Sequence, residues 1–224
     1  RIAYADAYGL MLYDLSTQQS RPAMTWQPAV IDSVPTFIVP IPGSLQWSHD
    51  GGYISWHEVY FEGGAIAIYG IDGLNNATSV TGHSSGLITW SGGADRFAVA
   101  SPEEVYTEEG LFVSRENDLT KTDDISATIG LAGGGFSYGQ LSDDGRSIAY
   151  RYDVFSDYES VELILGLAHA DGSDAVVLQD IDCRYLKCTG FTLTPFFMPD
   201  SDDVFTWEAT QILALRETAT STIP

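Results

Sequence analysis

The chain has 224 residues, of which 44% are hydrophobic and 12% aromatic; this suits one or two globular domains and excludes a collagenous or disordered chain. It carries 31 acidic and 10 basic residues, a net charge of −21. This charge argues against nucleic acid and anionic membranes as partners and favours cations or cationic proteins, since phosphate surfaces require a basic footprint. An adaptation to a salty or calcium-containing medium is the alternative explanation of the acidity.

The beginning of the chain has neither a Met nor a signal peptide, because Arg1 leads directly into the strand-like sequence IAYA. We therefore expect a mature form or part of a longer chain. No apolar run approaches the roughly 18 to 20 residues of a membrane helix, so we expect no membrane span.

A polar turn recurs along the chain. The stretch WSHDGGYISW at 47–56 predicts a short strand, a tight turn and a second strand, and similar stretches follow at WSGGADRFAVA, LSDDGRSIAY and MPDSDDVFTW. Asp suits this turn because it bonds the local backbone, and Gly because it accepts positive φ. The stretches begin at Trp47, Trp90, Leu141 and Met198, 43 to 57 residues apart. We expect second strands at 53–56, 96–99, 147–150 and 204–207.

Further strands complete each repeat. Third strands are expected at 65–69, 111–113, 163–167 and 212–215, followed by a second polar turn and a fourth strand such as 175–178. Four strands per repeat at this period are typical of a β-propeller blade, and helical periodicity is absent. We predict an all-β fold, a β-propeller of four-stranded antiparallel blades with about five blades, two of them incomplete. A β-sandwich of hairpins is the alternative, but it does not explain the recurrence of the turn.

The repeat resembles the WD40-like (PD40) repeat of TolB-type β-propellers. The resemblance is carried by WSHDGGYISW with IAIYGIDGLNNATSVT, and by LSDDGRSIAY with LILGLAHADGSDAVVL. It covers nearly the whole chain, although His49 and Asp143 replace the family's Pro and Gly93-Ala94 replace its Asp-Gly. The resemblance implies a propeller that serves protein–protein contacts in the cell envelope, a fold-level analogy for function.

The domain organisation follows from the repeat. We predict a single β-propeller domain, or part of one, over 1–224, with blade boundaries near 1–43, 44–86, 87–135, 136–190 and 191–218 and a tail at 219–224. The stretch RIAYADAYGLMLYDLSTQQ matches a second and third strand without the first, and the chain stops soon after a third strand. The two ends do not sum to one blade, so we expect an unconventional closure or further blades outside this stretch.

The candidate binding surface is the face where second-to-third strand hairpins meet. These hairpins, expected at 5–8, 57–62, 102–109 and 153–159, place carboxylates beside aromatic rings, which could receive a basic peptide or a carbohydrate. Polar tips with aromatics packed between blades are the alternative. The candidate partner-binding residues are Glu58, Tyr60, Phe61, Glu62, Glu103, Glu104, Tyr106, Glu108, Asp153, Phe155, Asp157 and Tyr158.

Two cysteines, Cys183 and Cys188, are separated by four residues, and no second pair or nearby His completes a zinc site. A disulfide-closed loop on the same face is therefore expected, which favours a periplasmic or extracellular protein; two free cytosolic thiols are the alternative.

Metal and cofactor signals are weak. The Asp-rich turns at Asp50, Asp143-Asp144 and 200–203 offer oxygen ligands that suit calcium, but none matches an EF-hand loop. We predict no cofactor. Ca²⁺ is the ion that these turns could bind, but the sequence assigns no metal ligand. The histidines His49, His57, His83 and His169 occupy different repeat positions, so they are not expected to share a metal.

No catalytic residue is predicted, because nucleophile-elbow, zinc-protease, P-loop and dinucleotide motifs are absent from the sequence. The leading hypothesis is a non-enzymatic, exported β-propeller that acts as a protein-binding or assembly module through its acidic-aromatic face. Its partner would be a protein, with a cationic one favoured, or further copies of itself. The alternatives are a propeller domain of a larger hydrolase or peptidase, a stand-alone propeller hydrolase or lyase acting on sugars or lactones, and a structural subunit of a surface layer or filament.

Overall fold

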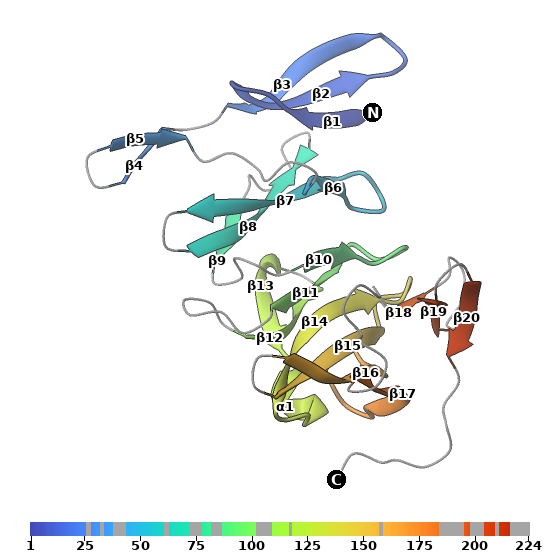
Figure 1. Ribbon diagram of the computed structural model, residues 1–224. Helices are drawn as coiled ribbons and strands as arrows, with labels where there is room; N and C mark the ends of the chain where they lie inside the picture. The colour runs from blue at the N-terminus through green and yellow to red at the C-terminus, as the bar shows by residue number, and fades with distance from the viewer. Residues whose placement is uncertain are drawn as a thin grey trace. The chain divides into compact units, whose positions relative to one another are not determined.

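The computed structural model divides the chain into two compact units, residues 1–84 and 85–224. It describes residues 1–25, 28–31, 34–37, 44–60, 63–71, 78–81, 87–101, 109–116, 118–156, 159–183, 195–197, 204–208 and 211–215. Most of these residues lie in β-strands, and the strands of each sheet pair with their neighbours in sequence (Figure 1).

The first unit holds two sheets and a ribbon. Its three-stranded sheet runs β1 (Ile2–Ala5), β2 (Gly9–Asp14) and β3 (Gln19–Thr25), and β4 (Pro28–Ile31) pairs with β5 (Val34–Phe37). The four-stranded sheet runs β6 (Gln46–Trp47), β7 (Tyr53–Tyr60), β8 (Gly63–Gly70) and β9 (Thr78–Thr81). The two larger sheets share an apolar core in which Leu10 and Leu12 of β2 join Ile54 and Trp56 of β7. Alternation along each strand is what places these side chains on one face.

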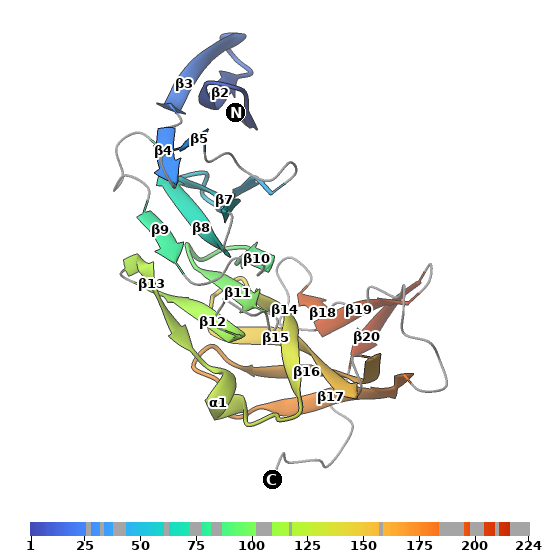
Figure 2. The same cartoon turned by 60° about the vertical axis from the view of Figure 1, so that its left-hand side comes forward.

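The second unit holds three sheets. One runs β10 (Leu87–Trp90), β11 (Phe97–Ser101), β12 (Gly110–Arg115) and β13 (Asp118–Asp124), followed by the single helical turn α1 (Ser126–Ile129). The next runs β14 (Gly134–Leu141), β15 (Ser147–Ser156), β16 (Glu159–His169) and β17 (Val176–Asp182). The last runs β18 (Pro195–Phe197), β19 (Val204–Glu208) and β20 (Gln211–Leu215), and every pairing is antiparallel (Figure 2).

The β14–β17 sheet is buried on both faces. Ile148 and Tyr150 of β15 lie in the core shared with Leu111 and Val113 of the β10–β13 sheet. Ala149, between them in sequence, packs on the opposite side against Phe197 and Val204 of the last sheet. Successive side chains of β15 therefore contact different neighbouring sheets, as the two-residue period of a strand requires.

The recurring turn has the same hydrogen bonds in both units. Asp50 Oδ1 accepts from Ser48 Oγ at 2.7 Å and from the Gly52 N–H at 2.6 Å, and Gly51 has φ of 71°. Asp144 Oδ1 likewise accepts from Ser142 Oγ at 2.8 Å and the Arg146 N–H at 3.0 Å, with Gly145 also at φ 71°. Each Ser is buried and its hydroxyl accepts the N–H five residues later, Tyr53 or Ser147. The predicted roles of Asp and Gly in the turn are confirmed.

The predicted all-β architecture of four-stranded antiparallel units is confirmed, with three complete sheets and an incomplete one at each end of the described chain. The expected second and third strands lie within observed strands, except that the strand expected at 96–99 begins one residue later, at Phe97. Two elements were not predicted. The β4–β5 ribbon contains Pro28 and Pro35, which weaken a strand signal, and α1 is too short to show helical periodicity.

Candidate functional site

The predicted hairpin-tip residues lie largely outside what the structure describes. Glu58 and Tyr60 fall in β7, of which only the backbone is described at these positions, and Asp153 and Phe155 fall in β15. The remaining candidates lie outside the described residues: Phe61, Glu62, Glu103, Glu104, Tyr106, Glu108, Asp157 and Tyr158. Their role in binding a partner stays a prediction.

Asp153 does not lie at a hairpin tip. Strand β15 continues to Ser156 and β16 begins at Glu159, so the hairpin expected over 153–159 is shorter and Asp153 is a strand residue. It is 4% exposed, and its carboxylate accepts hydrogen bonds from Arg151, 2.8 Å from Nη2 to Oδ1, and from the Ser137 hydroxyl. Phe155, two residues on, is 47% exposed. Of the two candidates in β15, Asp153 and Phe155, only the ring of Phe155 is accessible to a partner.

The hairpin between β1 and β2 has an exposed aromatic residue beside a carboxylate. Asp6 Oδ1 accepts from the N–H groups of Tyr8 at 2.7 Å and Gly9 at 2.9 Å. These bonds close the turn and leave the Tyr8 side chain 80% exposed. The acid therefore shapes the turn, and the aromatic ring supplies the accessible surface.

Cys183 directly follows β17 and is 4% exposed beside Leu163, Leu165 and Ile181. It is disulfide-bonded. Cys188, its predicted partner and the only other cysteine of the sequence, lies outside the described residues, so the pairing stays a prediction.

The histidines are scattered. His57 is almost fully buried in β7, and burial lowers its pKa, whereas His49 and His169 are exposed and His83 lies outside the described residues. Within the described ranges, no group of three or more His, Cys, Asp and Glu side chains could hold a metal ion. The described part of the chain also contains no helix long and apolar enough to span a membrane.

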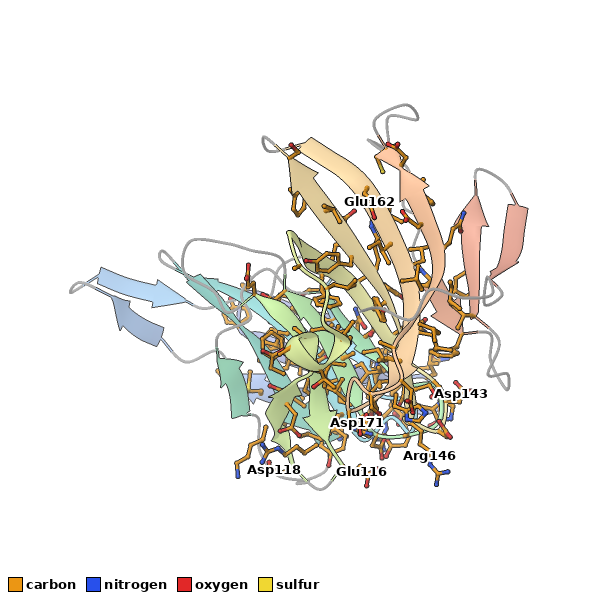
Figure 3. The ribbon with its side chains drawn as sticks, turned by 90° about the horizontal axis from the view of Figure 1, so that it is seen from below. Glu116, Asp118, Asp143, Arg146, Glu162 and Asp171 are labelled. Carbon is orange, nitrogen blue, oxygen red and sulfur yellow. The ribbon has the colours of Figure 1, made fainter. Side chains whose placement is uncertain are left out.

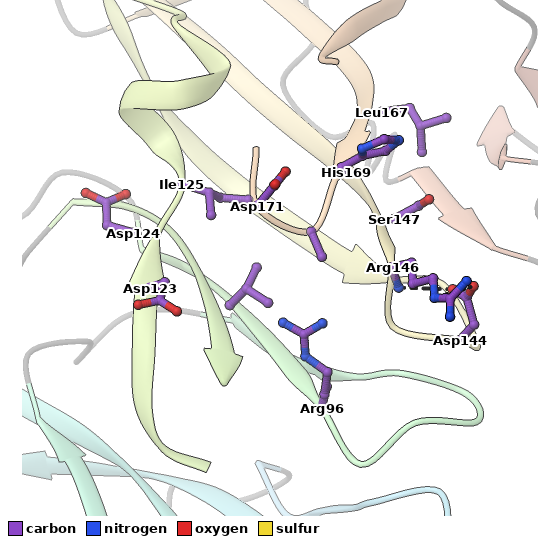
Figure 4. A pocket seen from close by; sticks show the side chains of 12 residues that line it. Arg96, Asp123, Asp124, Ile125, Asp144, Arg146, Ser147, Leu167, His169 and Asp171 are labelled. Atoms are coloured by element: carbon purple, nitrogen blue, oxygen red, sulfur yellow. Dashed lines mark hydrogen bonds and ion pairs between the residues drawn. The ribbon is translucent and has the colours of Figure 1, made fainter. Parts of the chain in front are cut away.

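A pocket of about 810 Å³ lies in the second unit between the β10–β13 and β14–β17 sheets (Figure 4). It opens at the end of these sheets where the β14–β15 and β16–β17 turns meet, the end that carries Asp143, Arg146 and Asp171, while Glu162 lies toward the other end (Figure 3). Its apolar lining comes from Val113, Ile125, Leu167 and Ala170. Its charged and polar lining comes from Arg96, Asp123, Asp124, Asp144, Arg146, Ser147, His169 and Asp171.

Arg96 holds one side of the pocket together. Its Nε and Nη2 donate to the Ser114 carbonyl at 3.1 and 2.9 Å, and its Nη1 donates to the Gly145 carbonyl at 2.7 Å. Ser114 lies in β12 and Arg96 directly precedes β11 of the same sheet, whereas Gly145 belongs to the β14–β15 turn. One guanidinium therefore joins the two sheets, with a side chain that is only 15% exposed.

A close approach at Gly172 holds the opposite side together. A Cβ at Gly172 would lie 2.8 Å from the Ile125 carbonyl oxygen and 2.9 Å from Thr128 Cβ, so the β16–β17 turn rests directly on the start of α1. Gly172 also has φ of 83°, which only glycine adopts freely. With both sides fixed by contacts between the sheets, the pocket is preformed.

The pocket carboxylates differ in their partners. The Arg146 N–H and the Ser142 hydroxyl lower the pKa of Asp144, and the hydroxyl and N–H of Ser173 lower that of Asp171. Asp123 forms an ion pair with Arg115, 2.5 Å from Oδ1 to Nη2. Because their pKa values are lowered, Asp144 and Asp171 carry negative charge at neutral pH.

Comparison with known proteins identifies the fold. No protein-family model and no curated protein matches the sequence. Among solved structures, TolB from Acinetobacter baumannii matches with a TM-score of 0.53 and 15% identity, over 92% of this chain and 45% of that one. The oligogalacturonate lyase in complex with manganese also matches with a TM-score of 0.53, at 12% identity, over 96% of this chain and 74% of the lyase. The chain has a TolB-like β-propeller fold.

The chain spans less than half the length of the A. baumannii TolB chain that it matches. In this propeller the pocket lies between two successive blades, at the end formed by the first-to-second and third-to-fourth strand turns. That is the end opposite the predicted hairpin tips. Sequence reasoning missed it because Arg96 and Asp171 are far apart in the chain, and only the Asp-Gly turns at Asp144 and Asp171 carried a local signal.

Proposed function

We propose that this chain is an exported β-propeller module that binds a protein partner, without catalytic activity of its own. The observation that carries the proposal is the preformed pocket between the β10–β13 and β14–β17 blades, whose charged rim and apolar lining suit side chains of another polypeptide. The TolB-like fold supports a binding role by analogy. The net charge of −21 favours a cationic partner or a cationic segment of one.

Export is supported by the cysteine. Cys183 is disulfide-bonded, and disulfides persist mainly in oxidising compartments such as the periplasm or the extracellular space. A secretory location can be tested by fractionating cells that express the full-length protein and by measuring free thiols with and without reductant. Recovery in the cytosolic fraction with two reactive thiols would contradict export.

The hairpin-tip face remains the second candidate surface for the partner. Tyr8 in the first unit and Phe155 in the second are each exposed at a β-hairpin, as an aromatic contact residue must be. The two surfaces can be separated by affinity capture with the purified protein. Loss of the partner in Phe155→Ser or Tyr8→Ser would assign the tips, whereas loss in the pocket variants below would assign the pocket.

The test of the proposal is capture of one defined partner followed by calorimetry with the purified pair. We expect a saturable one-to-one complex whose affinity falls as salt rises, because exposed charges are screened beyond a Debye length of about 10 Å at 0.1 M salt. Self-association is measured in parallel by light scattering. A chain that stays monomeric, captures no partner and turns over a sugar or peptide substrate would refute the proposal.

A further inference from the structure

The pocket between the β10–β13 and β14–β17 blades carries charges of both signs at different places on its wall. Asp124 and Asp171 lie near Ile125, while Arg146 lies on the far side with Asp144 (Figure 4). The guanidinium of Arg96 points into the space between them (Figure 4). The pocket is therefore bipolar and differs from a simple acidic patch.

The acidic side has carboxylate oxygens to offer. Asp124 Oδ1 accepts the Ser126 N–H at 2.9 Å, and Asp171 Oδ1 accepts the Ser173 N–H at 2.9 Å and its hydroxyl at 2.6 Å. Within the described ranges, neither carboxylate has an ion pair, and Oδ2 of each has no hydrogen bond. Each of these oxygens can accept from an ammonium or guanidinium group.

The basic side offers an exposed cation. The Arg146 side chain is 85% exposed, and the carboxylate nearest to it, Asp144, lies 3.8 Å away from Oδ2 to Nε. That distance is too long for a hydrogen bond, so the planar guanidinium can turn toward an incoming carboxylate and bind it through two N–H groups. Arg96 adds positive potential between the two sides, although its own donors serve the Ser114 and Gly145 carbonyls.

The lining between the charges is apolar. Val113, Ile125 and Ala170 face the cavity, and such a surface accommodates the aliphatic stem of a long charged side chain. The Arg96–Gly145 hydrogen bond and the close packing of Gly172 hold the acidic and basic sides of the pocket at a fixed distance in the absence of ligand. A preformed site loses less entropy on binding.

We propose that this pocket recognises a short partner segment that carries one basic and one acidic side chain, the basic group at Asp124 and Asp171 and the acidic group at Arg146. The proposal rests on the proposed binding function and names the chemistry of what is bound. Attraction to a chain of charge −21 alone would favour a purely basic segment, because an added acidic group is repelled. A bipolar site predicts the reverse, namely that the segment with both a basic and an acidic group binds more tightly than the purely basic one.

The inverted order can be measured with three tetrapeptides, acetylated at one end and amidated at the other so that only side chains carry charge. The first has lysine and glutamate at its ends, the second lysine and glutamine, and the third glutamine and glutamate. Calorimetry or NMR titration of the full chain at about 0.1 M salt gives three affinities. We expect the lysine–glutamate peptide to bind most tightly, the lysine–glutamine peptide next and the glutamine–glutamate peptide least.

Two variants assign the affinity to the pocket. The double variant Asp124→Asn, Asp171→Asn keeps the amide oxygens that close both turns and removes the charge, and Arg146→Gln removes the basic side. Each should weaken the lysine–glutamate peptide by about two- to fivefold per ion pair removed, the range of an exposed pair. The matched controls are Asp118→Asn and Lys121→Gln, which break an exposed ion pair outside the pocket and should leave binding unchanged.

Each outcome decides the proposal. If the lysine–glutamine peptide binds most tightly, or if Asp118→Asn weakens binding as much as the pocket variants do, general attraction explains the result and the bipolar site is wrong. If no tetrapeptide binds, the site is also wrong. In each of these cases, a partner captured by the intact protein would still support the proposed binding function, so the two failures are distinguishable.

Discussion

Replacing Arg96 with methionine tests the contact that joins the β10–β13 and β14–β17 blades. Methionine keeps much of the aliphatic stem but removes the charged donors to the Ser114 and Gly145 carbonyls, which they reach at distances of 2.7 to 3.1 Å. A hydrogen bond from a charged group contributes about 1.5 kcal/mol at the lower end of its range, and two carbonyl acceptors are left without that donor. The expected loss in the free energy of unfolding is therefore about 3 kcal/mol.

The assay is thermal and urea unfolding followed by circular dichroism. A loss of about 3 kcal/mol corresponds to a fall of about 6–12 °C in Tm for a chain of this size. The matched control is Arg146→Met, which removes the same charge from a side chain that is 85% exposed and only loosely paired with Asp144. A surface pair of this kind contributes about 0–1 kcal/mol, so the control should shift Tm by no more than about 4 °C.

The comparison separates a local contact from net charge. Removing any cation from a chain of charge −21 increases its self-repulsion, and both variants remove one positive charge. If Arg96→Met and Arg146→Met lower Tm by the same amount, the guanidinium contact between the blades contributes nothing measurable and the reasoning is wrong. The difference between the variants should also persist at high salt, where the repulsion is screened.

Three further predictions concern stability. Asp153→Ala should cost about 3–5 kcal/mol in urea unfolding, because it leaves Arg151 largely buried without its carboxylate, whereas the double change Arg151→Met, Asp153→Leu should recover most of that loss. Gly51→Ala should lower the free energy of unfolding by about 1 kcal/mol, because of its φ of 71° alone. Gly145→Ala should lower it by more, because it has the same φ and its Cβ would lie 3.1 Å from Ala94 Cβ. Equal losses would show that the turn containing Ala94 moves aside without cost. The lowered pKa values of Asp14, Asp144 and Asp171 mean that their stabilisation is complete above the ordinary pKa near 4 and is lost as pH falls below it, so Tm should drop in a titration below about pH 4, and Asp144→Asn should make that drop smaller.

The sequence predicted the strands well because each repeat satisfies several local rules at once. Alternation sets the strand faces, Asp and Gly mark the turns, and the recurrence of Ser48 and Ser142 before Asp50 and Asp144 reflects a shared set of hydrogen bonds. The repeat at Ser91 shows the limit of the pattern. It lacks the Asp, yet its hydroxyl donates to the Ala94 carbonyl and the turn keeps the same length.

The candidate site was harder to predict, for two different reasons. The end of β15 has no Gly or Pro to mark it, so Asp153 was placed in a hairpin when it belongs to the strand and pairs internally with Arg151. The pocket could not be found from local patterns at all, because it depends on how two blades pack. The sequence marks Arg96 only as the first residue of an expected strand, whereas in the structure its guanidinium reaches Gly145 in the next blade.

The position of the few basic residues bears on how this acidic propeller could choose a partner. Attraction by a net charge of −21 acts over the whole surface, so it speeds encounters with cationic proteins without orienting them. Orienting a bound partner requires a site that attracts a charge of one sign and disfavours a charge of the other sign at the same position. The pocket meets that requirement, because it combines Asp124 and Asp171, which form no ion pair within the described residues, with an exposed Arg146 on a frame fixed by Arg96 and Gly172. The pairing of Arg146 with Asp144 leaves that side without net negative charge, whereas Asp124 and Asp171 make the other side negative, and so a bound segment would have one favoured direction.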